Sequence, residues 1–196
     1  VLGPLRDAHP DLELTLTEVV TDELLRQLRG RLIDGALLAL PQDAGDLLAY
    51  PLFREPFWLA VSTSHPLAGR VALEVDEVPL EELLLLEPGH CLRDQVLAAC
   101  GTGILARRRL VHAAGLETQK AMVAAGMGCA VLPALAVAGD HPGVALLPFA
   151  SPAPGREIGL VVRRGGADPR DAREMATLLR QVARRHPALA PVEREG

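Results

Sequence analysis

Residues 12–40 have the sequence LELTLTEVVTDELLRQLRGRLIDGALLAL, and this stretch decides the fold class. Residues 12–20 begin with alternating apolar and polar side chains, which predicts a β-strand. Residues 22–34 have helical spacing, with Gly30 near the end. Residues 34–40 form a short apolar run, typical of a strand buried on both faces. A strand, a helix and a strand in succession form a βαβ unit, so we expect an α/β fold.

The rest of the chain continues this alternation. We expect further strands at residues 56–62, 82–87, 129–135, 144–149 and 156–164, and further helices at residues 91–100, 116–126 and 170–186. Strands that alternate with helices usually lie parallel, so we expect mainly parallel strands.

Two turn-like or proline-rich segments, residues 52–57 and 151–157, indicate where the chain crosses between two lobes. No long linker separates the lobes, which favours a chain that crosses twice. We therefore predict one lobe from residues 1–54 with 156–196, and a second lobe from residues 55–155. In such folds the ligand site lies beyond the carboxyl ends of the strands, here in the cleft between the lobes.

The composition excludes several classes of function. The formal net charge of -5 over 196 residues gives no sign of a nucleic-acid surface on this stretch of sequence. No apolar run approaches the ~20 residues of a membrane span, and the first residues lack the pattern of a signal peptide. We therefore expect a soluble, cytoplasmic protein without membrane contact.

The stretch GHCLRDQVLAAC, residues 89–100, places two of the three cysteines nine positions apart. In a reducing cytosol such a pair points to redox or metal chemistry. If the stretch is one helix, Cys91 and Cys100 face opposite sides and lie ~13–14 Å apart along the axis. A disulfide needs Cα atoms within ~7 Å, so the helix would have to unwind before the bond formed.

Three interpretations of Cys91 and Cys100 remain open on this basis. They can be small buried hydrophobic residues, which suits Cys100 better than Cys91. They can be metal ligands, although the spacing matches no structural zinc site, and we expect no metal. They can be a reactive couple, because a helix amino terminus with His90 and Arg93 nearby favours a thiolate at Cys91, and Cys100 could resolve its sulfenic acid.

GHCLRDQ followed by a second cysteine resembles the signature of the peroxide-sensing branch of the LysR-type transcriptional regulators, in their effector domain. Other segments follow the order of the same family; they are LTEVVTDELLRQLRGRLIDGALLAL, PLFREPFWLAVSTSHPLA, LETQKAMVAAGMGCAVLPALAV and REIGLVVRR. The cysteine motif is specific, whereas the other segments are shared more widely among LysR-type effector domains.

The resemblance implies two Rossmann-like lobes of the periplasmic-binding-protein-like type. It also implies homodimers or homotetramers, and an amino-terminal winged helix-turn-helix domain, absent from this chain, that binds promoter DNA and acts with RNA polymerase. The first strand of the effector domain is absent as well. No cofactor is expected.

Residue roles carry over from the family to matching positions. Cys91 becomes the thiol that reacts with hydrogen peroxide, and Cys100 becomes its disulfide partner. The expected peroxide pocket consists of Thr21, Gly89, His90, Arg93 and Asp94. Simpler roles stay open: Thr21 can be a helix cap, and Arg93 with Asp94 can be a solvated pair.

Two further residues have simpler expected roles. We expect Cys129 to be a core residue and His112 to be an ordinary surface or interface residue.

The function expected from the resemblance is a redox-switched transcription regulator that is not an enzyme. Oxidation would rearrange the helix between the cysteines and reorient the oligomer to activate antioxidant genes. An alternative is a LysR-type domain that binds an organic metabolite in the cleft. A thiol peroxidase and a solute-binding transport protein fit less well.

Overall fold

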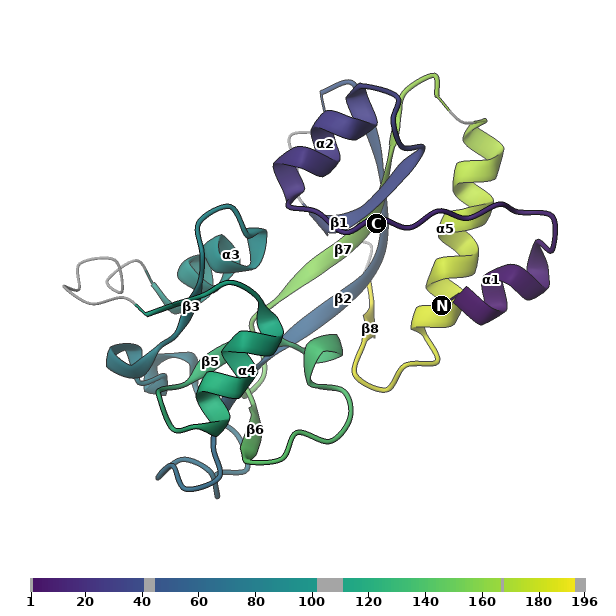
Figure 1. The fold of residues 1–196 in the computed structure, drawn as a ribbon. Coiled ribbons are helices and arrows are strands. Elements are labelled where there is room, and N and C mark those ends of the chain that lie inside the picture. The colour runs from purple at the N-terminus through teal and green to yellow at the C-terminus, as the bar shows by residue number, and fades with distance from the viewer. Residues whose placement is uncertain (1, 41–44, 102–110, 167, 193–196) are drawn as a thin grey trace. The chain divides into compact units, whose positions relative to one another are not determined.

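The computed structural model describes residues 2–40, 45–101, 111–166 and 168–192 (Figure 1). The chain forms two compact units, residues 1–54 with 157–196, and residues 55–156. The helices are α1 (Leu2–Ala8), α2 (Thr21–Arg29), α3 (Cys91–Cys100), α4 (Leu116–Ala124) and α5 (Pro169–Ala183). The strands are β1 (Gly35–Leu40), β2 (Leu47–Ser62), β3 (Leu85–Leu86), β4 (His112–Ala113), β5 (Ala130–Pro133), β6 (Val144–Pro148), β7 (Gly155–Arg163) and β8 (Ala190–Pro191). Short 3₁₀ helices lie at Val75–Glu77, Leu80–Glu82 and Ala134–Val137.

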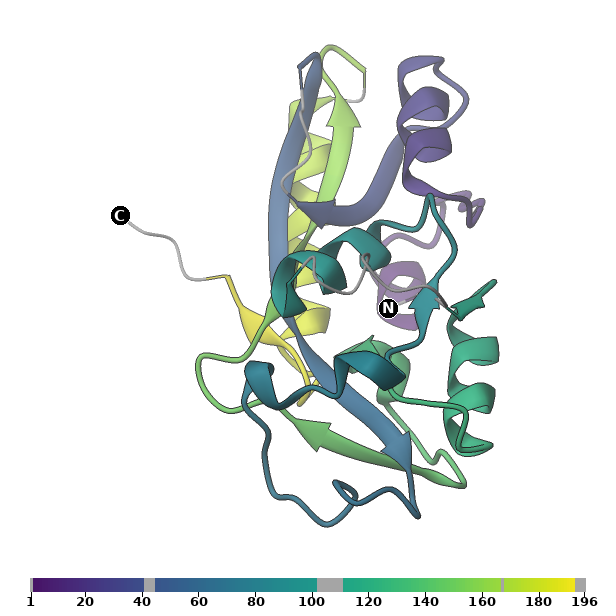
Figure 2. The same ribbon diagram turned by 90° about the vertical axis from the view of Figure 1, so that its left-hand side faces the viewer.

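The first unit is a sheet with a helix on each face. Strand β7 lies between β1 and β2, and β8 pairs with the first half of β2. Successive side chains of a strand point to opposite faces. On β7, Leu160 and Val162 therefore pack with α5, whereas Val161 packs with α2. Figure 1 shows α2 and α5 on opposite sides of these strands, and in Figure 2 α5 lies behind them.

The second unit is built on the second half of β2. This part of β2 pairs with β5, from Phe57↔Pro133 to Ala60↔Ala130, and with β6. Phe57 and its neighbours on the same face, Leu59 and Val61, pack in the core beneath α3. The opposite face of β2 packs with α4. A separate small sheet, β3 with β4, lies against both helices.

The α/β class is confirmed, but the expected strand direction is wrong. Strand β1 pairs antiparallel with β7, and β2 pairs antiparallel with β5, β6 and β8. Among the ladders described here, β3–β4 is the parallel one. A continuous apolar run shows that a strand is buried on both faces but carries no signal for the direction of its neighbour.

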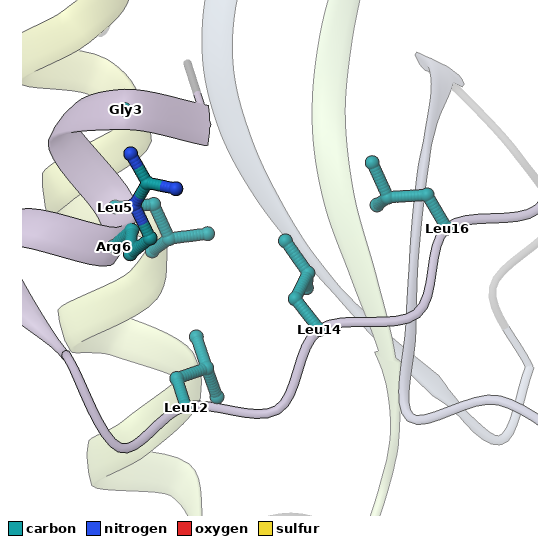
Figure 3. A pocket seen from close by; sticks show the side chains of 6 residues that line it. All are labelled: Gly3, Leu5, Arg6, Leu12, Leu14 and Leu16. Atoms are coloured by element: carbon teal, nitrogen blue, oxygen red, sulfur yellow. The ribbon is translucent and has the colours of Figure 1, made fainter.

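The strand predicted at residues 12–20 is also wrong. This segment carries no strand assignment, and residues 11–20 are exposed. Its alternating pattern does produce one apolar side: Figure 3 shows Leu12, Leu14 and Leu16 projecting from the same side of the segment, and these leucines line a pocket with Leu5 of α1. A strand also requires a neighbour that shares its backbone hydrogen bonds, and no described residue supplies one to this segment.

The first helix of the expected βαβ unit is shorter than predicted. Helix α2 ends at Arg29, and the backbone N–H of Gly30 donates to the carbonyl of Arg26 at 2.8 Å. Arg31 follows with a φ of 62°, a left-handed conformation that cannot continue a helix. The apolar residues after it belong to a turn that leads into β1.

Within the described residues, none of the helices combines the length and apolar character of a membrane span.

Candidate redox site

The predicted helix at residues 91–100 is confirmed as α3, with a cysteine at each end. Gly89 precedes it with a φ of 99°, and Gly101 ends it with a φ of 93°. Glycine adopts these values without the steric cost that a side chain brings, so the sequence delimits the helix at both ends. One side of α3 is held in the core by three buried apolar residues, Leu92, Val96 and Leu97.

Cys91 and Cys100 are both free thiols and both half-buried. Nine helical steps rotate the chain by two and a half turns, so the two side chains point to opposite sides of α3. The rise along the axis is ~13–14 Å, about twice the largest Cα separation that a disulfide tolerates. The two thiols therefore cannot bond while α3 is helical.

The surroundings of the thiols differ. Cys91 occupies the first turn of α3, directly after His90, whose backbone is extended. Cys100 packs against the core of the second unit, and burial raises the pKa of its thiol. Cys129 is confirmed as a core residue with no exposed surface. Burial and the nearby Glu82 raise the pKa of Cys129 to about 12.

The side chain of Arg93 connects α3 to the small sheet formed by β3 and β4. Its Nη1 donates to the backbone carbonyl of Leu86 at 3.0 Å and lies 3.3 Å from Nε2 of His112. Leu86 belongs to β3 and His112 to β4, and these strands pair in parallel through Leu85↔His112. One side chain of α3 thus contacts both strands of this sheet.

A small cavity lies beneath α3. It is lined by Leu84, Leu85, Leu86, Leu92, Arg93, Val96, Gln119 and Val131. Gln119 of α4 is buried, and its Nε2 donates to the carbonyl of Leu84 at 2.8 Å, whereas its Oε1 has no partner among the described residues. The cavity is mainly apolar and shows that α3 rests on a layer of leucines and one amide.

The candidate residues from the sequence fall into two groups. Gly89, His90, Cys91, Arg93, Asp94 and Cys100 all lie in or next to α3, in the second unit. Thr21 lies in the first unit as the first residue of α2. The cap position of α2 is occupied by Val20, so the reading of Thr21 as the cap is wrong. A pocket that joins Thr21 to the residues of α3 stays a prediction.

His112 and Gln119 were not singled out as site residues by the sequence. His112 lies in a two-residue strand with no periodic pattern, so nothing in the sequence indicated that it faces Arg93. Gln119 is a polar residue in a short helix, and its burial depends on the packing of α4 against β3. In the described part of the chain, no three His, Cys, Asp or Glu side chains come together as metal ligands.

Comparison with known proteins gives consistent matches along the chain. The sequence pattern of the LysR substrate binding domain matches residues 1–184. The DNA-binding transcriptional dual regulator OxyR of Escherichia coli K12 is 41% identical over 167 residues, which is 84% of this chain and 55% of that protein. The chain spans 55–60% of the length of the first curated relatives that it matches.

Solved structures of OxyR proteins are also similar to this chain. The reduced OxyR regulatory domain of Pseudomonas aeruginosa is 34% identical with a TM-score of 0.82, over 92% of this chain and 88% of that one. A hydrogen-peroxide-bound OxyR mutant of Corynebacterium glutamicum is 32% identical with a TM-score of 0.85, over 94% of this chain and 59% of that one.

Proposed function

This chain belongs to the LysR substrate binding domain family, and we propose that it is the regulatory part of a transcription regulator that senses hydrogen peroxide through Cys91 and Cys100. One observation carries the proposal: two free thiols lie at the two ends of a single ten-residue helix bracketed by glycines. The helix and the disulfide exclude each other, so oxidation would change the local fold.

The proposed reaction consumes one hydrogen peroxide and forms two waters. The thiolate of Cys91 attacks one peroxide oxygen, the O–O bond breaks, and Cys91 becomes a sulfenic acid while the leaving hydroxide takes up a proton as water. The thiol of Cys100 then attacks the sulfenic sulfur. The S–S bond forms, the S–O bond breaks, and the second water leaves. The sulfurs are oxidised and the peroxide oxygens are reduced.

The order of these roles agrees with the surroundings of the two thiols. Burial raises the pKa of Cys100, so its thiol stays protonated more readily and is the poorer attacking group. Cys91 stands at the amino end of α3, where backbone N–H groups and the helix dipole favour a negative charge on a ligand or an intermediate.

The wider function rests on the relatives. The Escherichia coli relative is a DNA-binding transcriptional regulator, so we propose that this chain controls promoter DNA through a winged helix-turn-helix domain and acts with RNA polymerase in the cytoplasm. We further propose a homodimer or homotetramer whose arrangement changes on oxidation. Each peroxide molecule would set a switch rather than start catalytic turnover, so the domain is proposed not to be an enzyme.

A second candidate is the binding of an organic metabolite, which the general description of the family favours. In that case the cysteines would be incidental, and a metabolite would stabilise the protein while peroxide would have no effect.

Intact mass after addition of stoichiometric peroxide tests the proposal. We expect the wild type to lose two hydrogens, and we expect Cys91→Ser to stay unchanged. Cys100→Ser should retain a sulfenic acid that a dimedone-type reagent traps. Cys129→Ala serves as the matched control and should behave like the wild type. An unchanged mass in the wild type would refute the proposed sensing reaction.

A further inference from the structure

The contact between Arg93 and His112 depends on the protonation state of the histidine. A guanidinium carries only donors, so His112 Nε2 at 3.3 Å must present its lone pair, and the ring proton must be on Nδ1. Arg93 Nη1 has two hydrogens, which allows it to donate to Leu86 and His112 together. The contact as it stands therefore requires a neutral His112.

Protonation of His112 would replace this hydrogen bond with repulsion between two positively charged groups. Nε2 would then carry a hydrogen that faces the hydrogens of Arg93, and two positive charges would lie side by side. Histidine is the side chain that usually changes charge between pH 5 and 8. Arg93 would lose one of its two anchors on the small sheet, while its bond to Leu86 would remain.

Several other charged groups lie on the elements near His112. The elements packed against His112 carry Glu87 and His90 before α3, Asp94 on α3, and Glu117 with Lys120 on α4. Glu117 and Lys120 pair with each other at 2.7 Å. Within the described residues, Arg93 is the charged group whose contact with the His112 ring is established.

We propose that His112 is a positioning residue that acts through Arg93 to hold α3 helical in the reduced state, and that its protonation favours the Cys91–Cys100 disulfide. This inference rests on the proposed function, because the disulfide requires α3 to unwind. The direction follows from the contact: a neutral His112 accepts from Arg93 and stabilises the anchored helix, whereas a protonated His112 cannot accept this hydrogen bond.

The test is the equilibrium of the whole chain with reduced and oxidised glutathione, in which two glutathione thiols are oxidised for each disulfide reduced. The fraction of disulfide is read by intact mass after alkylation, at about pH 8 and about pH 5.5, the two sides of the histidine range. His112→Gln keeps a neutral acceptor at both values, and His186→Gln is a control histidine in the first unit.

Wild type and His112→Gln should have similar equilibrium constants near pH 8. Near pH 5.5 the wild type should favour the disulfide about two- to fivefold more than His112→Gln, which is the size of effect that an exposed contact produces. His186→Gln should follow the wild type. If all three proteins change equally with pH, the role of His112 is refuted and the proposed function stands. If no disulfide forms in the wild type at either pH, both are refuted.

Discussion

The thiol of Cys129 has no exposed surface, and burial with the nearby Glu82 raises its pKa to about 12. Its Sγ lies 3.8 Å from the backbone carbonyl of Pro79, as a weak donor. Cys91, by contrast, is half-buried at the end of a helix. The position of each residue in the fold, rather than its identity as cysteine, therefore distinguishes Cys91, which we propose to be reactive, from Cys129, which we expect to be inert.

Alkylation of the reduced, folded protein near pH 8 should distinguish these thiols. Cys129 is protonated and inaccessible under these conditions, so iodoacetamide should modify Cys91 and leave Cys129 unmodified until denaturant is added. Peptide mass spectrometry after a timed quench measures both sites. Modification of Cys129 in the folded protein as fast as Cys91 would contradict its placement in the core.

At the scale of elements, the helix expected at residues 91–100 is present with the expected ends, and a glycine lies close to each end. Residues 12–20 show the opposite case. Their alternation predicted a strand that the structure does not contain, although Leu12, Leu14 and Leu16 do line one pocket. Strand formation depends on a partner elsewhere in the fold, and a local pattern contains no information about that partner.

Other elements show the same limit. Strand β2 begins at Leu47, nine residues before the strand predicted at residues 56–62. Residues 52–57 were interpreted as a turn-like crossing, whereas the strand continues through them. The contact of Arg93 with His112 joins residues 19 positions apart and was not predictable from spacing. The sequence pattern thus predicted the helix of the site, whereas the contacts that hold this helix in place could be identified only from the structure.

The stability of α3 should control how readily the disulfide forms. Ala98 is an exposed interior residue of α3, so Ala98→Gly should weaken the helix by about 1 kcal/mol and shift the glutathione equilibrium about fivefold toward the disulfide. Ala121 holds an equivalent exposed position in α4.

Ala121→Gly is therefore the matched control, with a similar cost in overall stability and no expected change in the equilibrium. Equal shifts in the two variants would show that general destabilisation, rather than unwinding of α3, governs disulfide formation.

At the scale of the whole molecule, Glu55 lies where the chain enters the second unit, and Arg156 lies where it leaves. Glu55 is fully buried; it accepts hydrogen bonds from Arg156 Nε at 2.8 Å and from the backbone N–H of Leu135 at 2.9 Å. The two ends of this unit are thus joined to each other and to a short 3₁₀ helix by one carboxylate.

Removal of the Glu55 carboxylate should lower the stability of the protein. Glu55→Ala leaves the guanidinium of Arg156 and one backbone donor without their partner, so we expect a loss of about 3–5 kcal/mol in the free energy of unfolding. Glu117→Ala removes an 88% exposed carboxylate and should leave the urea midpoint nearly unchanged. Equal midpoints for the two variants would contradict this account of Glu55.

The central claim is that α3 and the Cys91–Cys100 disulfide exclude each other. Amide hydrogen exchange of residues 91–100, followed by mass spectrometry of peptides before and after stoichiometric peroxide, tests it most directly. We predict that protection of this segment is lost on oxidation in the wild type and retained in peroxide-treated Cys100→Ser, which cannot form the bond. A mapped Cys91–Cys100 disulfide with full protection of the segment would contradict the claim.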